Sequence, residues 1–512
     1  MVKGILLEGT VLGKVKKQKP LGRGAGILLP VSCLPSDYGI GSLGKAAYEF
    51  VDFLAAAGQS YWQVLPLGPT GYGDSPYQSF SAFAGSPYYI DLQTLVEQGF
   101  LRLSEAKAPD WGERTDWVDY GKLYKNRFEV LRKAWSRSGW ERDPAFCSFC
   151  EENRFWLEDY ALFMALKDSF DGLAWQSWPE KLRLREPDAL RDCRERMKEQ
   201  TAFWQYVQYL FFTQWKKLKV YANQKGVRII GDIPIYVAMD SADVWANASL
   251  FQMDQNRRPL AVAGVPPDLF SSTGQLWGNP LYDWRAMEAD GFGWWKKRMA
   301  ASAGWYDLIR IDHFIGIVHY YSIPAGEKTA MNGRWMPGPG EKLLEAVTPA
   351  LSGKKIIAED LGVVTPPVRR LLRKSGYPGM KLMEFAFDST SANEYLPCHF
   401  EKNIVVYGGT HDNETLAGFF GPGQNRRMLQ FARRYLNVSR NAQIPWELIR
   451  AGYASCADTV IFQLQDFLGL GNEARINTPS TLGGNWCWRL VPGQLSGGLA
   501  DRIEELVKLY DR

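Results

Sequence analysis

Eight short apolar runs, each followed by polar or charged residues, constrain the fold of this chain more than any other feature. The runs begin at Gly26, Ser60, Val227, Asp307, Lys354, Gly379, Asn403 and Asp458. Several of them are continuously apolar before the polar end, which is typical of parallel strands that are buried on both faces. Eight such units, each joined to a helical pattern, predict an α/β fold: a (β/α)8 TIM barrel with its active site at the carboxyl ends of the strands.

The spacing of the runs predicts insertions within one large domain. A chain of 512 residues fits either several domains or one barrel with inserted segments. The uneven gaps favour a single catalytic domain over residues 1–512, with subdomains inserted at the carboxyl-terminal face. We expect a largely helical insertion over 68–226, between strands two and three. A second, loop-rich insertion is expected over 238–306, between strands three and four, because Pro and Gly are frequent there.

Composition and charge exclude several classes of protein. Hydrophobic residues make up 46% and charged residues 23%, which is ordinary for a globular protein. The net charge of +4 is close to neutral for this length and predicts no nucleic acid and no membrane partner. The amino-terminal stretch is too short and too interrupted for a signal peptide, and it lacks the Ser-rich bias of a transit peptide. We therefore expect a cytoplasmic location, with the plastid stroma as the alternative.

Two motifs suggest a metal or a cofactor, and the surrounding sequence argues against both. Cys147 and Cys150 form a lone CxxC without a second pair, so a structural role is favoured over zinc and no metal is expected. Residues 39–44 fit the GxGxxG pattern of dinucleotide sites. The next run, however, lacks the acidic residue that such a site requires near its end. The pattern favours a turn, and no cofactor is expected.

Three acidic residues follow predicted strands. Asp312 closes the fourth run, Glu359 the fifth and Asp412 the seventh. Each acid taken alone could equally well be a helix cap or part of an ion pair as a site residue. Like charges gathered at one rim cost free energy unless the site uses them, so three together indicate function. Two of the four histidines, His313 and His411, directly follow and precede two of these aspartates.

Paired carboxylates in an aromatic cleft suit the chemistry of glycosidic bonds. One carboxylate attacks the anomeric carbon, while the other donates a proton to the leaving oxygen and later accepts one. Retention of configuration needs carboxyl groups only about 5–5.5 Å apart. Neighbouring strands lie about 4.7–4.9 Å apart, so Asp312 and Glu359 on adjacent strands meet this requirement. Aromatic residues, 14% of the chain, suit both a large core and a groove for sugar rings.

Longer motifs carry a resemblance to a known family. They are LPSDYGIGSLG, GDSPYQSFSAFAG, GDIPIYV, GQLWGNPLY, RIDHF, IAEDLG, PGMK, GTHDNET, EARIN and NWCWR. The chain resembles the 4-α-glucanotransferases (amylomaltases, or disproportionating enzymes) of glycoside hydrolase family 77, from about residue 24 to residue 490. The resemblance implies retaining transfer of an α-1,4-glucan segment to the 4-hydroxyl group of another glucan or of glucose. It also implies a covalent glucosyl-aspartate intermediate, with malto-oligosaccharides, amylose and glucose as donors and acceptors.

The resemblance also implies roles for particular residues. Asp312 matches the nucleophile, Glu359 the general acid and base, and Asp412 the third carboxylate. Arg310 matches the arginine that keeps the nucleophile ionised. Gln275 matches a polar partner in a flexible loop over the cleft. The remaining matches to substrate-binding positions are Tyr77, Asp232, Trp277, His313, Phe385 and His411.

Two other functions stay open on the sequence alone. An α-1,4-glucan hydrolase of the same clan would carry the same three carboxylates. A noncatalytic glucan-binding barrel is disfavoured, because a protein that only binds needs no nucleophile. Oligomeric state is left open.

Overall fold

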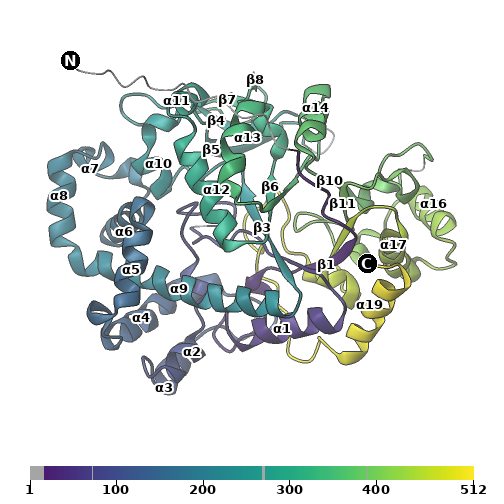
Figure 1. Ribbon diagram of the computed structural model, residues 1–512, viewed down its shortest axis with the longest axis horizontal. Helices are drawn as coiled ribbons and strands as arrows, with labels where there is room; N and C mark the ends of the chain where they lie inside the picture. Colours follow the sequence, from purple (N-terminus) through teal and green to yellow (C-terminus); the bar gives the residue numbers. More distant parts are fainter. Residues whose placement is uncertain (1–16, 72, 268–270, 389) are drawn as a thin grey trace, which may run out of the picture.

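The eight predicted runs form one parallel sheet in the computed structural model, which describes residues 17–71, 73–267, 271–388 and 390–512. Its strands follow the order β10-β11-β12-β1-β2-β3-β6-β9 at the centre of the molecule (Figure 1). Their bounds are β1 (Gly24–Leu28), β2 (Tyr61–Gln63), β3 (Arg228–Pro234), β6 (Leu308–Asp312), β9 (Lys355–Ala358), β10 (Gly379–Leu382), β11 (Ile404–Tyr407) and β12 (Thr459–Gln463). The predicted (β/α)8 barrel is confirmed.

The two ends of this strand order meet and nearly close the barrel. The N–H of Ala358, at the end of β9, donates to the carbonyl oxygen of Pro378 over 2.9 Å. The N–H of Met380 on β10 donates to the side chain of Asp360 over 2.8 Å. These two bonds join β9 to β10, so few backbone groups of the edge strands lack a partner.

Side-chain alternation along each strand separates the inside of the barrel from the outside. On β12, Val460 and Phe462 pack into the large core between strands and helices, whereas Ile461 packs into a smaller core inside the barrel. On β6, Ile309 faces the outer core and Leu308 the inner one. Because successive side chains of a strand point to opposite faces, Arg310 also points inward.

Helices cover the outside of the barrel, and sequence signals set their ends. Those beside the strands are α1 (Lys45–Ala56), α9 (Lys198–Gln224), α12 (Gly293–Trp305), α13 (Glu341–Val347), α14 (Pro366–Ser375), α17 (Ile444–Ala454) and α19 (Gly497–Leu509). For example, α14 begins with Pro366 and ends before Gly376, whose φ is +71°. Proline suits the first helical position, and glycine adopts the left-handed conformation that ends a helix. None of the described helices is long and apolar enough to cross a membrane.

Between β2 and β3 the regular structure of the described residues is helical and lies to one side of the barrel (Figure 1). Before α9 come α2 (Leu92–Glu97), α3 (Leu103–Lys107), α4 (Tyr120–Arg137), α5 (Pro144–Glu152), α6 (Arg154–Ser169), α7 (Glu180–Arg183) and α8 (Pro187–Arg196). The 27-residue helix α9 packs on α6 along one part and on α1 and β3 along another. It therefore joins the helical segment to the barrel.

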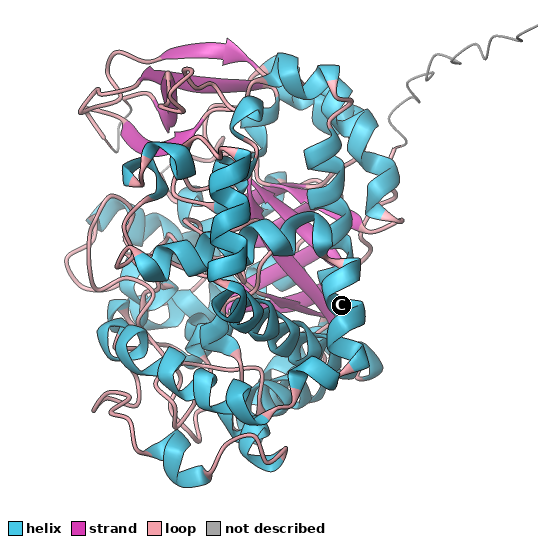
Figure 2. Ribbon diagram, turned by 90° about the vertical axis from the view of Figure 1, so that its left-hand side faces the viewer, coloured by secondary structure: helices cyan, strands magenta, loops and turns pink. Residues whose placement is uncertain are grey.

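A second, antiparallel sheet stands apart from the barrel (Figure 2). Its order is β5-β4-β7-β8, built from β4 (Ala261–Val265), β5 (Gln275–Pro280), β7 (His319–Pro324) and β8 (Arg334–Pro337). The sequence analysis expected loops over 238–306 and did not predict this sheet. The short helices α10 (Ala242–Ala246) and α11 (Trp284–Ala289) lie in the same segment, and α12, which precedes β6, contacts the barrel. Two of the four strands follow β6, outside the range that was expected to form the insertion.

Candidate active site

The carboxyl ends of β6 and β9 bring Asp312 and Glu359 together. Ile311 pairs with Ala358 in the parallel ladder, and the N–H of Glu359 donates to the carbonyl oxygen of Ile311 over 3.0 Å. The ladder therefore continues to the last residue of each strand. The prediction that Asp312 and Glu359 lie at the ends of neighbouring strands is confirmed.

Arg310 connects two carboxylates inside the barrel. Its Nη1 atom donates to both oxygens of Asp232 over 2.8 and 2.7 Å and lies 2.9 Å from Oδ1 of Asp312. Asp232 comes from β3, where it pairs with Arg310 in the ladder. Burial alone would lower the pKa of Arg310, but the two carboxylates raise that pKa well above its usual value. A permanent positive charge therefore lies against the carboxyl group of Asp312.

Replacing Arg310 with methionine should destabilise the fold as well as the site. Asp232, only 1% exposed, would be left as a buried charge without its cationic partner. Breaking a buried pair in this way costs about 3–5 kcal/mol, which urea unfolding would measure. The matched control is Arg114→Met, because the ion pair of Arg114 with Asp116 is exposed and its loss should change the free energy of unfolding far less. Equal losses of unfolding free energy in the two variants would contradict a stabilising role for the buried pair of Arg310 and Asp232.

Glu359 is held by backbone donors and is buried. Its Oε2 accepts from the N–H of His313 and its Oε1 from the N–H of Leu361, each over 2.7 Å. Burial, followed by the charge of Asp312, raises the pKa of Glu359 to about 8. Glu359 is therefore protonated near neutral pH, as a general acid must be before the first step.

His313 directs its backbone toward Glu359 through an unusual conformation. Its φ of +51° lies in the left-handed region that non-glycine residues rarely adopt. Burial lowers the pKa of its imidazole to about 4, so the ring is neutral. The ring contacts Trp277 edge to face, with 4.9 Å between centroids. Its Nε2 is buried and has no hydrogen-bond partner among the described residues.

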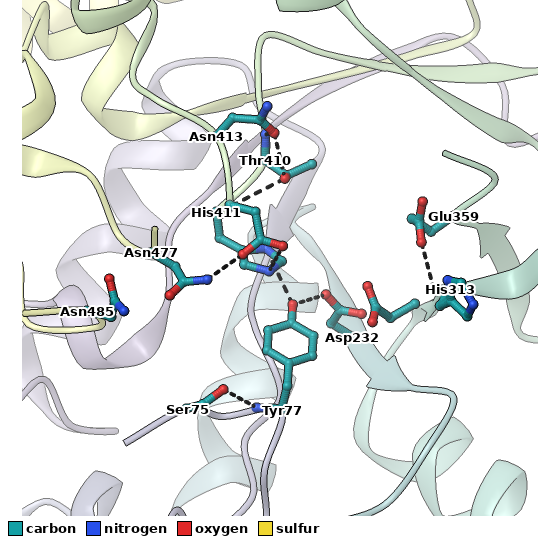
Figure 3. Close-up of polar contacts among 12 residues, drawn as sticks. Ser75, Tyr77, Asp232, His313, Glu359, Thr410, His411, Asn413, Asn477 and Asn485 are labelled. Carbon is teal, nitrogen blue, oxygen red and sulfur yellow. Dashed lines mark hydrogen bonds and ion pairs between the residues drawn. The ribbon is translucent and has the colours of Figure 1, made fainter. Parts of the chain in front are cut away.

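Asp412 follows β11 and contacts Asn477 and His411, both labelled in Figure 3. Its Oδ1 accepts from the side-chain amide of Asn477 over 2.6 Å, and its Oδ2 lies 3.4 Å from Nε2 of His411. Its side chain is 47% exposed, so it is accessible to a ligand. Tyr77 stacks on His411 at 4.8 Å and donates its hydroxyl proton to Asp232 over 2.7 Å. One network thus links all these groups to Arg310.

The sequence analysis did not single out two residues beside this network. Asn477 fixes Asp412, and the ring of Trp486 lies 6.0 Å from Tyr77 and 5.9 Å from His411. Both stand in motifs that carried the resemblance, EARIN and NWCWR. Their place in these motifs was the only sequence signal for a role in the site. Local periodicity does not show that the loop before α19 folds against the end of a strand.

The remaining predicted residues lie farther from the carboxylates. Gln275 and Trp277 belong to β5 rather than to a loop, and the indole N–H of Trp277 donates to Oε1 of Gln275 over 3.0 Å. Phe385 is 38% exposed and packs edge-on against Tyr395 at 5.5 Å. Trp277 is joined to the site through His313. Phe385 lies just beyond β10, with its ring free to meet a ligand.

A pocket adjoins Asp412 on its outer side. The residues that line it include Trp117, from the helical segment between β2 and β3, and Arg475, Thr478 and Asn485, from the loop that precedes α19. Its volume is about 390 Å³. Arg475 donates to the carbonyl oxygen of Asp412 over 2.7 Å, so pocket and site share one wall. Among the described residues, no group of three His, Cys, Asp or Glu side chains is arranged to hold a metal ion.

Comparison with known proteins agrees with this geometry. The sequence profile of the family described as 4-alpha-glucanotransferase matches residues 29–494. A 4-alpha-glucanotransferase of Clostridium butyricum is 47% identical over 94% of this chain and 99% of its own length. A chloroplastic/amyloplastic 4-alpha-glucanotransferase of Arabidopsis thaliana is 42% identical over 96% of this chain and 86% of its own length. The solved amylomaltase of Streptococcus agalactiae in complex with acarbose is 40% identical, covers 96% of this chain and 99% of its own, and superposes with a TM-score of 0.92.

Proposed function

The chain belongs to the 4-alpha-glucanotransferases of glycoside hydrolase family 77, and from this membership we propose how its three acidic strand ends carry out the transfer. The enzyme transfers a segment of an α-1,4-glucan to the 4-hydroxyl group of another glucan or of glucose. We assign Asp312 as the nucleophile, Glu359 as the general acid and base, and Asp412 as the carboxylate that holds the sugar. The observation that carries this assignment is that two neighbouring strand ends place Asp312, held by Arg310, beside the buried and protonated Glu359.

The first displacement forms a bond between Asp312 and the donor. Glu359 gives its proton to the bridging oxygen while a carboxylate oxygen of Asp312 attacks C1 of the sugar. The fragment with the reducing end leaves carrying that proton. Arg310 orients Asp312 for the attack, and Asp412, open to the ligand, binds sugar hydroxyl groups as positive charge develops at C1.

The second displacement returns both carboxylates to their starting states. Once the ester forms, the charge of Asp312 is lost, so one cause of the raised pKa of Glu359 disappears. Glu359, now a carboxylate, takes the proton from the incoming 4-hydroxyl group, whose oxygen attacks C1 and releases Asp312. Two inversions give net retention.

The substrates that we propose are α-1,4-glucans on both sides of the reaction. Sugar rings present apolar faces and a rim of hydroxyl groups, which aromatic rings and amides complement. Tyr77 and Trp277 supply such rings beside His411 and His313, the partly exposed Phe385 supplies one beyond β10, and Gln275 and Asn477 supply amides. The acarbose bound to the Streptococcus agalactiae relative supports a carbohydrate ligand for this cleft.

We further infer that the inserted segments shape the groove. The helical segment contributes Trp117 to the pocket beside Asp412, and the segment after β3 contributes Trp277. Both insertions therefore reach the site from the carboxyl-terminal face.

We also infer that the enzyme acts in the cytoplasm. The plastid stroma is the alternative location, since the Arabidopsis thaliana relative is chloroplastic/amyloplastic.

Incubation with maltotriose alone tests the function. Glucose together with maltopentaose and longer chains is the expected product pattern, because each cleaved segment is passed to another sugar. Glucose and maltose with nothing longer than the substrate would mean that water accepts the segment and that the protein is a hydrolase.

The pH profile of kcat/KM tests the role of Glu359 as an acid. Glu359 must be protonated for the first step, and its pKa is about 8. Activity should therefore hold at neutral pH and fall as the pH rises through about 8. A donor with fluoride at C1 is the control, because fluoride leaves without a proton. Formation of the intermediate from that donor should lack the alkaline decline, and a decline shared by both donors would contradict the assignment.

A further inference from the structure

A buried glutamate lies beneath the turn that carries His411 and Asp412. Glu384 belongs to the short helical turn Met383–Ala386 that follows β10, and it is 4% exposed. Its backbone N–H donates to the carbonyl oxygen of Gly408, just after β11, over 3.1 Å. The mechanism described above does not use this carboxyl group.

The side chain of Glu384 reaches the turn through Asn413. The amide nitrogen of Asn413 donates to Oε2 of Glu384 over 3.0 Å. The amide oxygen of Asn413 accepts from both the N–H and the hydroxyl of Thr410, each over 2.9 Å (Figure 3). Asn413 therefore closes the turn from residue 410 to residue 413, and His411 and Asp412 lie within it.

Close packing fixes this turn against the carboxyl group. A Cβ atom on Gly409 would lie 2.7 Å from Oε1 of Glu384 and 2.7 Å from Cβ of Asn413. No residue other than glycine fits there without displacing one of these groups. Because the backbone at Gly409 lies directly on the carboxyl group, a shift of either would move the other.

The surroundings favour a neutral carboxyl group at Glu384. Burial, followed by the charge of Asp466, raises the pKa of Glu384 well above its usual value, and burial raises the pKa of Asp466 to about 7. The other charged groups that face Glu384 are Glu414, which raises its pKa, and Arg475, which lowers it. Among the described residues, Oε1 of Glu384 and Oδ2 of Asp466 are buried and have no hydrogen-bond partner. A negative charge on Glu384 would be uncompensated.

We propose that Glu384 is a positioning residue for the third carboxylate: it orients Asn413, and Asn413 fixes the turn that presents His411 and Asp412 to the sugar. The proposal rests on the role assigned to Asp412 above. Glu384 itself touches no substrate. Its neutral carboxyl group accepts from Asn413 on one oxygen, and Asp466 holds the far end of the same loop by accepting from the N–H of Leu416 over 2.8 Å.

Two substitutions at Glu384 separate this role from simple loss of a buried side chain. Glu384→Gln keeps the shape, the neutrality and an oxygen acceptor for Asn413, so kcat for maltotriose should stay within about threefold of the wild type. Glu384→Ala removes the acceptor, and displacement of Asp412 by a fraction of an ångström should lower kcat by about 10- to 100-fold. KM should change by less than about threefold, because the contacts of Asp412 strengthen mainly in the transition state.

A double-mutant cycle shows whether Glu384 acts through Asn413. Asn413→Ala should lower kcat as much as Glu384→Ala, and the double variant should lose no more than either single variant. Asp307→Ala is the matched control. Asp307 is a largely covered acid, 10% exposed, before β6 at the opposite end of the barrel, so its loss should lower the melting temperature and leave kcat of the folded enzyme unchanged.

Three results would overturn the proposal. They are an unchanged kcat in Glu384→Ala, losses that multiply in the double variant, and a Glu384→Gln variant as impaired as Glu384→Ala. Asp412→Asn, measured in parallel, separates this outcome from a failure of the proposed function. If Asp412→Asn transfers as fast as the wild type, the role given to Asp412 is wrong, whatever Glu384 does.

Discussion

Asp312→Ala should lose at least about 10⁴-fold of its transfer activity, the largest effect of any single substitution in this chain. Among the described residues, the two other carboxylates of the network are already engaged. Asp232 is buried and bonded to Arg310 through both oxygens, and Asp412 is bonded to Asn477 and lies beside His411. Without Asp312 the enzyme still binds glucan but forms no covalent intermediate.

The loss in Asp312→Ala should come from chemistry and not from unfolding. Asp312 is 28% exposed, and without it Arg310 keeps its buried ion pair with Asp232, so the fold loses little. We expect a nearly unchanged melting temperature. Asp307→Ala, at the other end of the same strand, is the control that should keep its rate. Transfer above a few per cent of the wild-type rate in Asp312→Ala would refute the assignment.

Glu359→Ala should show a loss that depends on the leaving group. With maltotriose the variant should be about 10²- to 10⁴-fold slower, because no group protonates the bridging oxygen. With a maltosyl fluoride donor the first step should proceed, since fluoride needs no proton. Azide, which attacks C1 without a general base, should then restore turnover and give an α-linked product.

The contrast between the two donors is the informative measurement for Glu359. A role only in structure or in binding would slow both donors equally. Glu359→Gln provides a matched comparison, because it keeps the size of the side chain and its acceptor oxygen for the N–H of His313 or of Leu361. Equal impairment with maltotriose and with the fluoride donor would contradict the acid and base role.

The barrel was predictable because its strands are buried on both faces. On β12, for example, Ile461 packs inside the barrel and Phe462 packs outside it, so the sequence is continuously apolar there. The same alternation made the site partly predictable. It turns Arg310 inward, and the carboxyl ends of parallel strands meet at one rim, where Asp312 and Glu359 were expected.

Other parts were not predictable from local pattern. The strand β4 consists of small residues, AVAGV, and is only partly buried, so it lacks the alternation that marks a strand. Glu384 follows an apolar run in the way that Glu359 does, and no local signal separates an acid beneath a turn from one at the site. Asn477 reaches Asp412 across 65 residues of sequence, which only the folded chain brings together.

The proposed double displacement requires a covalent bond between a sugar and Asp312. The direct measurement is to mix Glu359→Ala with a maltosyl fluoride blocked at its terminal 4-hydroxyl group, so that the donor cannot act as an acceptor, and then to digest and weigh the peptides. The peptide that contains Asp312 should gain the mass of one glycosyl group, and Asp312→Ala in the same background should gain none. A label on a peptide without Asp312, or no labelled peptide while fluoride is released, would contradict the account.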